Sequence, residues 1–236
     1  MRCVYLENLV RDARDPGTLG RFWAAALGLT ELTDEPDGYE ARLPFDDHFL
    51  DLCFQRVDDP SPAPNRLHLD LRGGEAQQEV VDRLLRLGAV RADIGQGDVP
   101  WTVLADPEGE AFCVMEDRPA YRHGGPLAGL PLDSADPERD AAFWAAVSGW
   151  VRVEGTPGVP SLRHPSGTGP LLELCREPAP KGAGKNRLHL DLRAEPSDPA
   201  GRVLALGATL VADPPLPWTI YADPSGNEFC VLDARS

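Results

Sequence analysis

The chain contains two copies of one sequence pattern, and this duplication constrains its fold more than any other feature. Residues 65–72 (Asn-Arg-Leu-His-Leu-Asp-Leu-Arg) recur letter for letter at residues 186–193, and Phe-Trp-Ala-Ala at 22–25 recurs at 143–146. Later motifs recur in the same order at a slightly shorter offset, including Pro-Trp-Thr and Phe-Cys-Val. A period this long is typical of repeated domains and is too long for a solenoid.

The repeat gives the predicted domain organisation. We expect a first domain over residues 1–117, a linker over 118–126 and a second domain over 127–236. The linker is predicted because this polar segment contains two prolines and two adjacent glycines.

Local patterns within each copy predict a strand, a helix and three further strands, with this order occurring twice. The first helix starts at Asp15-Pro16 and ends at Gly28, and Asp136-Pro137 with Gly149 repeats these signals. A second helix is expected over 75–87, and the strands of the first copy near 3–9, 30–33, 39–43, 49–56, 66–72, 90–92, 101–105 and 111–116. Phe22 and Trp23, like their repeats, are predicted to pack in the core. The fold class is therefore α+β.

The exactly repeated strand carries the main functional signal. Its leucines alternate with Arg66, His68, Asp70 and Arg72, so that one face is apolar and the other polar. On a concave sheet such residues would form the polar floor of a cup. A histidine with arginine and aspartate beside it can bind a metal, act as acid or base, or orient a ligand.

Composition narrows the class of partner. The formal net charge is −15, which argues against nucleic acid and permits a cationic small-molecule ligand. Neither a signal peptide nor an apolar run of membrane-spanning length is evident, so we expect a cytoplasmic protein without a membrane partner. The five cysteines form no CxxC pair and are expected to be reduced and buried. The preference for arginine over lysine is typical of a GC-rich bacterial genome.

These motifs together resemble the vicinal oxygen chelate superfamily, which comprises glyoxalase I, bleomycin-resistance and extradiol dioxygenase proteins. The resemblance rests on the Asp-Pro-led helices carrying Phe-Trp, the Arg-Leu-His-Leu-Asp-Leu strand and the Asp-Pro-x-Gly-x-x-Phe-Cys-Val hairpin, and it covers the whole chain. It implies tandem domains of paired βαβββ units, each pair forming a curved, cup-shaped mixed sheet with helices outside. Units pair within or between chains in this superfamily, so the duplication allows an intrachain pseudo-dimer, and a homodimer is a further expectation.

The resemblance also implies four metal-ligand positions in each module. They align here with Asn8 and Gly129, with Asp51 and Glu173, with His68 and His189, and with Cys113 and Cys230. The candidate metal ligands are therefore Asp51 with His68 in the first copy and Glu173 with His189 in the second, and the first copy is the better candidate. This set is incomplete beside the three protein ligands of a catalytic zinc. We expect either no cofactor or one divalent metal (Zn, Ni, Mn or Fe).

Two functions follow as hypotheses. The first is a metal-free protein that binds a small molecule, for sequestering an antibiotic or a toxic metabolite. Its expected ligand-binding residues are Arg66, Asp70, Trp101, Arg187, Asp191 and Trp218. The second is a lyase, isomerase or oxygenase that uses a divalent metal or uses His68 or His189 as a general base. The incomplete ligand set argues against glyoxalase I activity itself.

Overall fold

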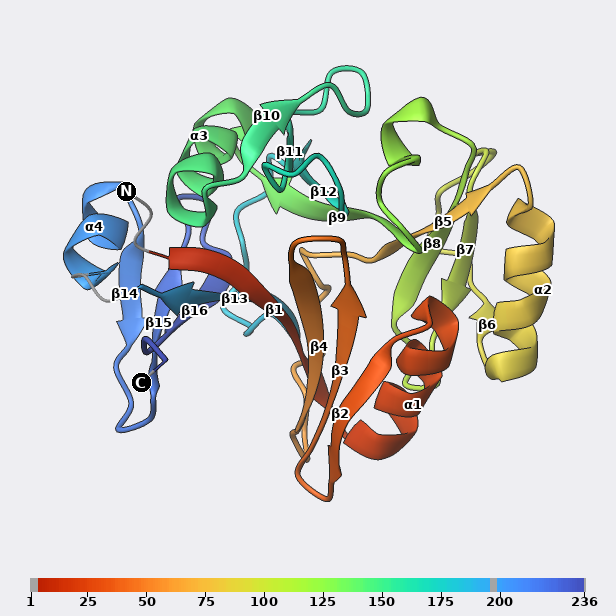
Figure 1. Ribbon diagram of the computed structural model, residues 1–236, viewed down its shortest axis with the longest axis horizontal. Helices are drawn as coiled ribbons and strands as arrows, with labels where there is room; N and C mark the ends of the chain where they lie inside the picture. Colours follow the sequence, from red (N-terminus) through yellow and green to blue (C-terminus); the bar gives the residue numbers. More distant parts are fainter. Residues whose placement is uncertain (1–3, 196–198, 236) are drawn as a thin grey trace.

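A computed structural model describes residues 4–195 and 199–235 and contains two mixed eight-stranded sheets (Figure 1). Sheet A has the order β14-β15-β16-β13-β1-β4-β3-β2, and sheet B has the order β10-β11-β12-β9-β5-β8-β7-β6. The strands of sheet A are β1 (Val4–Ala13), β2 (Thr30–Glu35), β3 (Gly38–Pro44), β4 (Phe49–Arg56), β13 (Leu188–Ala194), β14 (Thr209–Ala212), β15 (Trp218–Ala222) and β16 (Glu228–Leu232). Those of sheet B are β5 (Asp70–Gly74), β6 (Val90–Arg91), β7 (Thr102–Ala105), β8 (Ala111–Glu116), β9 (Leu127–Ser134), β10 (Val151–Val153), β11 (Ser161–Arg163) and β12 (Leu171–Arg176).

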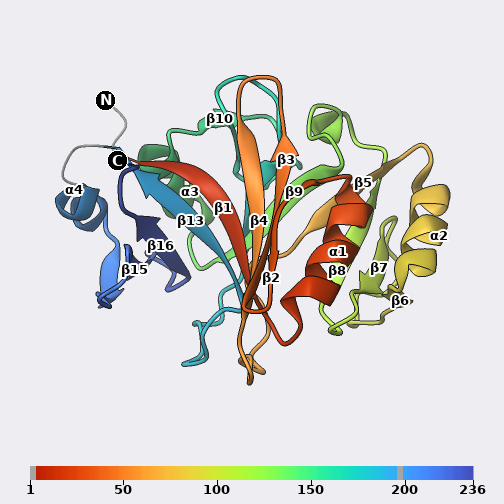
Figure 2. The ribbon, with the colours of Figure 1, turned by 60° about the horizontal axis from the view of Figure 1, so that its bottom comes forward.

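Each sheet combines strands from both sequence repeats. Strand β1 of the first repeat pairs antiparallel with β13 of the second, and Figure 2 shows the two side by side. In sheet B, β5 of the first repeat pairs antiparallel with β9 of the second. The expected α+β fold of paired βαβββ units is therefore confirmed. The units that share a sheet come from different repeats, and this decides which residues can meet.

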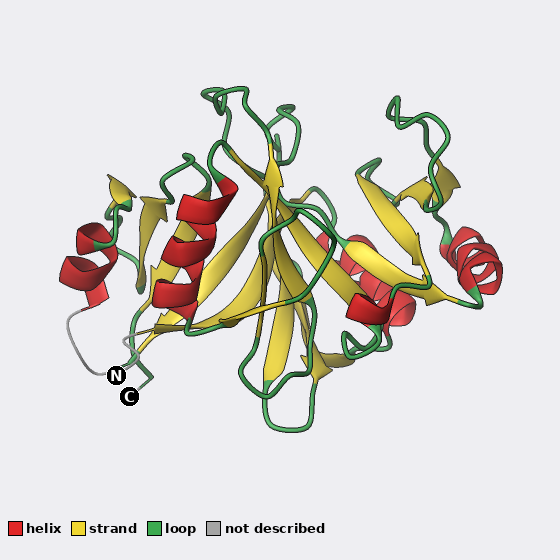
Figure 3. Ribbon diagram, turned by 90° about the horizontal axis from the view of Figure 1, so that it is seen from above, coloured by secondary structure: helices red, strands yellow, loops and turns green. Residues whose placement is uncertain are grey.

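The helices are α1 (Pro16–Leu27), α2 (Gln77–Leu87), α3 (Pro137–Ser148) and α4 (Pro199–Ala205), and they lie outside the strands (Figure 3). The predicted ends of α1 are confirmed: the Asp15 carboxylate accepts the Thr18 N–H at 3.0 Å, and Gly28 closes the helix with φ of 68°. Asp136 and Gly149 do the same for α3. These ends were predictable because caps depend on neighbours in the sequence.

Within each sequence repeat, the tryptophan of the Phe-Trp motif donates a hydrogen bond to the aspartate of the Asp-Pro-x-Gly motif. The Trp23 indole N–H donates to the Asp106 carboxylate at 3.3 Å, and Trp144 donates to Asp223 at 3.1 Å. Both tryptophans are buried, as predicted, and each packs edge-on against a phenylalanine of the following hairpin. Folding alone therefore accounts for the recurrence of these motifs.

The remaining local predictions agree with the structure apart from strand ends. Strands β4 and β8 have the predicted bounds, while β1 runs on to Ala13. Cys53, Cys113, Cys175 and Cys230 are unpaired thiols that are buried or partly buried, and Cys3 lies outside the described residues. Among the described residues, no helix is both long and apolar enough to cross a membrane.

Candidate functional site

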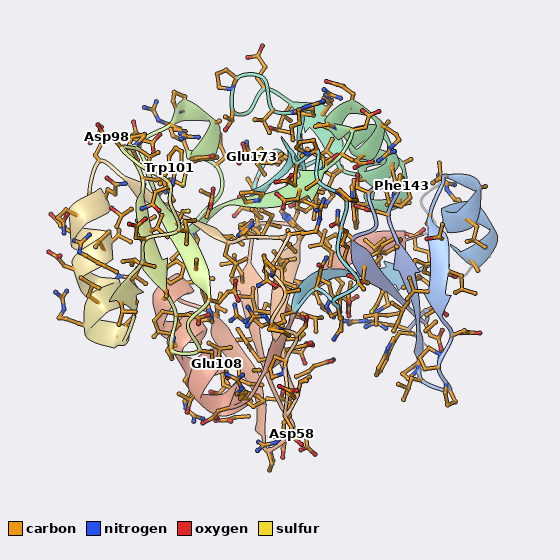
Figure 4. All side chains as sticks on the ribbon, turned by 180° about the vertical axis from the view of Figure 1, so that it is seen from behind. Asp58, Asp98, Trp101, Glu108, Phe143 and Glu173 are labelled. Atoms are coloured by element: carbon orange, nitrogen blue, oxygen red, sulfur yellow. The ribbon has the colours of Figure 1, made fainter. Side chains whose placement is uncertain are left out.

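A pocket of about 290 Å³ lies on sheet B, and we call it the sheet B pocket. Figure 4 labels two of its residues, Trp101 and Glu173, both in the upper part of the view. Both repeats and the segment between them supply its lining: His68, Asp70, Ile94, Gln96, Trp101, Cys113 and Met115 from the first repeat, Arg118 and Tyr121 from the segment 118–126, and Pro131, Thr156, Val159, Glu173 and Cys175 from the second repeat. The pocket therefore exists only because units of different repeats share this sheet.

Two carboxyl groups, from Asp70 and Glu173, line this pocket. Asp70 lies on β5, opposite Cys113 of β8 and Gly129 of β9, and is buried. Burial, and after it the charge of Glu173, raise the pKa of Asp70 to about 8, against the opposing influence of Arg118 and a hydrogen bond with Cys113. Asp70 therefore carries a proton at neutral pH and can donate a hydrogen bond.

Glu173 is fixed in place by its neighbours. The Tyr121 hydroxyl donates to Glu173 Oε2 at 3.0 Å, and the Thr156 hydroxyl donates to Oε1 at 2.6 Å. A Cβ at Gly129 would lie 2.8 Å from Glu173 Oε2, so the missing side chain at Gly129 leaves room for this carboxylate. The floor of the pocket thus presents both a donor and an acceptor.

The wall around these carboxyl groups is aromatic and apolar. Trp101 and Met115 form part of it, and the Arg118 guanidinium lies 5.7 Å from the Trp101 ring centre and 5.4 Å from that of Tyr121. Arg118 also forms an ion pair with Glu116. An apolar pocket with a few convergent polar groups is the usual form of a small-molecule site.

A second group of chemically competent residues lies on sheet A. His189 and Asp191 of β13 and Cys230 of β16 are buried, with one ligand atom of each lying within 4.8 Å of the others; we call them the sheet A cluster. His189 Nε2 lies 3.4 Å from Asp191 Oδ1. Asn8 of β1 lies opposite Asp191. Buried atoms of Asn8 (Oδ1), His189 (Nδ1) and Asp191 (Oδ1) have no hydrogen-bond partner, which is a costly arrangement unless something binds there.

The expected pairing of metal ligands within each repeat is wrong. Asp51 lies on β4 of sheet A, whereas His68 precedes β5 of sheet B, because each repeat divides its strands between the sheets. Glu173 on sheet B and His189 on sheet A are separated in the same way. The structure instead places His68 with Glu173 in one pocket. The Asp51 carboxylate forms a bidentate ion pair with Arg42, whose Nε and Nη2 donate to its two oxygens at 2.8 and 2.7 Å.

The other residues predicted to bind ligand divide into two groups. Asp70 and Trp101 line the sheet B pocket, Asp191 belongs to the sheet A cluster, and Trp218 lines a groove of about 690 Å³ beside the end of β4. Arg66 and Arg187 hold the repeats together instead. Arg66 donates to Asn227 at 2.9 Å, and Arg187 pairs with Glu110. Their position on the polar face of the repeated strand did not reveal these partners in the other repeat.

Sequence reasoning missed Arg118, Tyr121 and Thr156. Arg118 and Tyr121 lie in the predicted linker, where the structure forms a short 3-10 turn (η1, Pro119–Tyr121) with Tyr121 almost fully buried. Tyr121 is the only tyrosine, tryptophan or phenylalanine between residues 117 and 126, and that was the available signal. Thr156 lies in a loop with no signal that could have marked it.

The sequence pattern of the glyoxalase-like domain family matches residues 8–115 and 130–232. The chain belongs to the glyoxalase-like domain family. The two matched segments correspond to the two sequence repeats, so the family is represented twice. A comparison with curated proteins gave no match.

Solved structures with the same fold include two that span nearly the whole chain. Glyoxalase I from Zea mays has a TM-score of 0.67 at 18% identity and covers 98% of this chain and 92% of its own. A putative dioxygenase from Bacillus subtilis subsp. subtilis str. 168 has a TM-score of 0.60 at 13% identity and covers 100% and 86%. At these identities the likeness concerns the fold alone.

The metal implied by the resemblance fits sheet A better than sheet B. The sheet A cluster offers an imidazole, a carboxylate and a thiol, together with unpartnered buried atoms. Burial raises the pKa of the Cys230 thiol far above its usual value, so an ion must displace its proton. Among the described residues, those lining the sheet B pocket do not form such a group of three. Burial and Asp70 raise the pKa of Cys113 there in the same way.

Proposed function

We propose that this glyoxalase-like protein binds a small organic molecule in the sheet B pocket, so as to sequester an antibiotic or a toxic metabolite. The observation that carries the proposal is the pair of carboxyl groups, Asp70 and Glu173, in an otherwise largely apolar pocket. Its volume of about 290 Å³ is at the small end of the range for ligand sites, roughly 300–1,000 Å³. The expected ligand is therefore of metabolite size.

The protonation of Asp70 suggests what the ligand offers to the protein. At neutral pH the protonated carboxyl group donates a hydrogen bond, while Glu173 accepts them from Tyr121 and Thr156. A carbonyl or hydroxyl oxygen suits Asp70, and a ring can stack on Trp101. A cationic ligand would favour the ionised form of Asp70 and would therefore release a proton on binding. Its affinity should then rise as the pH approaches 8.

The two repeats provide a matched pair of variants for the test. Trp101 lines the sheet B pocket, while its repeat counterpart, Trp218, lines the groove on sheet A. We would screen cationic antibiotics, catechols, and aldehydes with glutathione by thermal shift, and measure each hit by calorimetry. Trp101→Leu should weaken binding by about 5- to 150-fold, from the stacking energy of about 1–3 kcal/mol per ring. Trp218→Leu should leave affinity unchanged, and the reverse result would place the ligand on sheet A.

A second function, metal-assisted catalysis, is favoured by the unpartnered atoms of the sheet A cluster. His189, Asp191 and Cys230 would hold a divalent ion, with Asn8 beside them. A bound ion would supply Lewis-acid chemistry, the polarisation of a substrate oxygen. His189, with Asp191 at 3.4 Å, is also placed to take up a proton.

Cobalt titration tests this second function, because a cobalt–thiolate bond absorbs strongly in the near ultraviolet. We expect that absorption in the wild-type chain and its loss in Cys230→Ser. Cys113→Ser, the same change at the repeat-related position, is the control. Equal absorption from the Cys230→Ser protein would refute metal binding at the cluster.

A further inference from the structure

A second pocket, of about 300 Å³, lies where a loop of sheet A meets a loop of sheet B, and none of its described lining residues lines the sheet B pocket. We call it the inter-sheet pocket. Its lining includes four aromatic side chains: Tyr5, Phe45, Phe49 and Trp150. We propose that the inter-sheet pocket binds a small aromatic amine, with the ring among these side chains and the ammonium group beside Asp47. The proposal does not rest on ligand binding in the sheet B pocket.

Both repeats and both sheets contribute to this pocket. Phe45 and Asp47 lie in the turn between β3 and β4 of sheet A, and His164 follows β11 of sheet B. The Phe45 N–H donates to the His48 carbonyl at 2.8 Å, which closes the turn. Trp150 comes from the second repeat and is buried just after α3. The sequence of one repeat therefore could not reveal the pocket.

Three stacked rings form one wall of the inter-sheet pocket. The His48 and His164 ring centres lie 3.8 Å apart with 17° between the planes, and the Phe45 ring centre lies 4.6 Å from that of His48 at 15°. The lone pairs of two nearly parallel imidazoles do not converge, so this wall does not suit a shared metal ion. It suits an aromatic ring, because aromatic rings attract one another edge to face and in offset stacks. The wall is formed before binding, so its side chains lose little conformational freedom.

The volume of the pocket limits the size of the ligand. About 300 Å³ is at the small end of the range for ligand sites, roughly 300–1,000 Å³. This space suits one ring or two fused rings with a short side chain. The lining also contains the apolar residues Leu6, Leu50 and Pro170. The ring of the ligand would therefore lie mostly against carbon atoms, while a short chain carries the amine toward solvent.

Charge at the exposed edge of the pocket favours a cationic group. Asp47 lines the pocket and its side chain is 56% exposed, so the carboxylate reaches solvent. A hydrogen bond with His48, at 3.0 Å, lowers the pKa of Asp47, so the carboxylate is ionised at neutral pH. A carboxylate accepts about four hydrogen bonds, and its bonds with His48 and Ser166 leave sites for an ammonium group. Neither lysine nor arginine is among the described residues that line the pocket.

Arg42 shows that one of the pocket rings already holds a cation. Its guanidinium carbon lies 3.6 Å from the centre of the Phe49 ring. Arg42 is itself neutralised by Asp51, which accepts two hydrogen bonds from it. A second cation would therefore meet little repulsion from Arg42, while the aromatic faces and the chain's net charge of −15 attract it.

The test measures the binding of tryptamine and phenethylamine to the full chain by calorimetry. Indoleacetate carries the same ring as tryptamine with a negative charge, and it should bind at least about tenfold more weakly. Asp47→Asn should weaken the binding of both amines about 3- to 10-fold and leave the binding of uncharged indole unchanged. Asp46→Asn is the matched control, because Asp46 is a neighbouring exposed residue that does not line the pocket.

Ring variants separate this site from the sheet B pocket. Phe49→Leu keeps an apolar side chain but removes a ring, and it should weaken amine binding about 2- to 12-fold. Trp101→Leu removes a ring of the sheet B pocket and should leave amine binding unchanged. Thermal melting checks that each variant folds; if Phe49→Leu does not fold, Asp47→Asn decides alone, since that side chain lies in an exposed turn. No binding of either amine by the wild type at millimolar concentration, unchanged affinity in the Asp47→Asn chain, or a loss in Trp101→Leu instead, would overturn the proposal.

Discussion

Replacing Asp70 by asparagine should remove a pH dependence of stability that this one carboxyl group creates. The pKa of Asp70 is about 8 in the folded chain, against an ordinary value of 3.8. Below pH 3.8 both the folded and the unfolded chain hold the proton, so the group costs nothing. Between the two values only the folded chain holds it, and stability falls as pH rises, by about 1.4 kcal/mol per pH unit. Above pH 8 the loss is complete, at about 6 kcal/mol.

Asparagine has the same shape and does not titrate, so the Asp70→Asn chain lacks this loss. Its free energy of unfolding, relative to the wild type, should increase by about 2.7 kcal/mol between pH 5 and pH 7. Urea unfolding at pH 5, 6, 7 and 8, followed by tryptophan fluorescence, measures this difference. A difference that stays constant across these pH values would refute the buried, protonated state of Asp70.

Two other variants identify the cause of the effect. Asp58→Asn makes the same change at a side chain that is 95% exposed, far from the pocket in Figure 4, and should leave the slope unaltered. Glu173→Gln removes the second-largest contribution to the raised pKa of Asp70. In that variant the fall in stability should end at a lower pH. If it ends at the same pH, burial alone sets the pKa.

Three further changes test the packing. Gly20→Ala should destabilise the chain by about 1–3 kcal/mol, because a Cβ there would lie 2.1 Å from the Tyr39 ring. Gly17→Ala is the control, since a Cβ there would meet only flexible side chains and the change should be nearly neutral. Thermal melting of both variants distinguishes the two cases. Trp144→Phe removes the indole N–H bound to buried Asp223 and should cost about 1–3 kcal/mol in urea unfolding. The same change at the partly buried Trp218 should cost far less. Burial raises the pKa of the Cys230 thiol, so Cys230 in the native protein at pH 8 should resist alkylation until urea exposes it. Mass spectrometry after iodoacetamide labelling measures this resistance. Rapid labelling of Cys230 in the native protein would contradict its burial.

Much of the fold was predictable from neighbours in the sequence. Asp15 and Gly28 mark the ends of α1, and alternating leucines mark the repeated strand, because capping and strand faces depend on residues a few positions apart. The family resemblance extended these local signals to paired βαβββ units. His68, Asp70, Trp101 and Glu173, which the sequence marks as candidate site residues of different sites, line one pocket in the structure.

The partner groups around those residues were not predictable. Tyr121, from a segment that reads as a linker, and Thr156, from a loop, hold Glu173 through hydrogen bonds. Neither residue lies near Glu173 in the sequence. The pKa of Asp70 is likewise raised by burial and then by the charge of Glu173, and both act only in the folded sheet.

The sequence by itself determined the duplication, the unit that is duplicated and the polar face of its central strand. Only the tertiary structure decided which units share a sheet. Strands β5 and β13 derive from the identical segments 65–72 and 186–193, so either could offer β1 the same side chains and the same backbone hydrogen bonds. Local pairing energy cannot choose between identical partners. The packing of the whole chain joins β5 to β9 and thereby assembles the sheet B pocket, which neither repeat contains alone. It also joins β1 to β13 and so places Asn8 of the first repeat beside the sheet A cluster of the second.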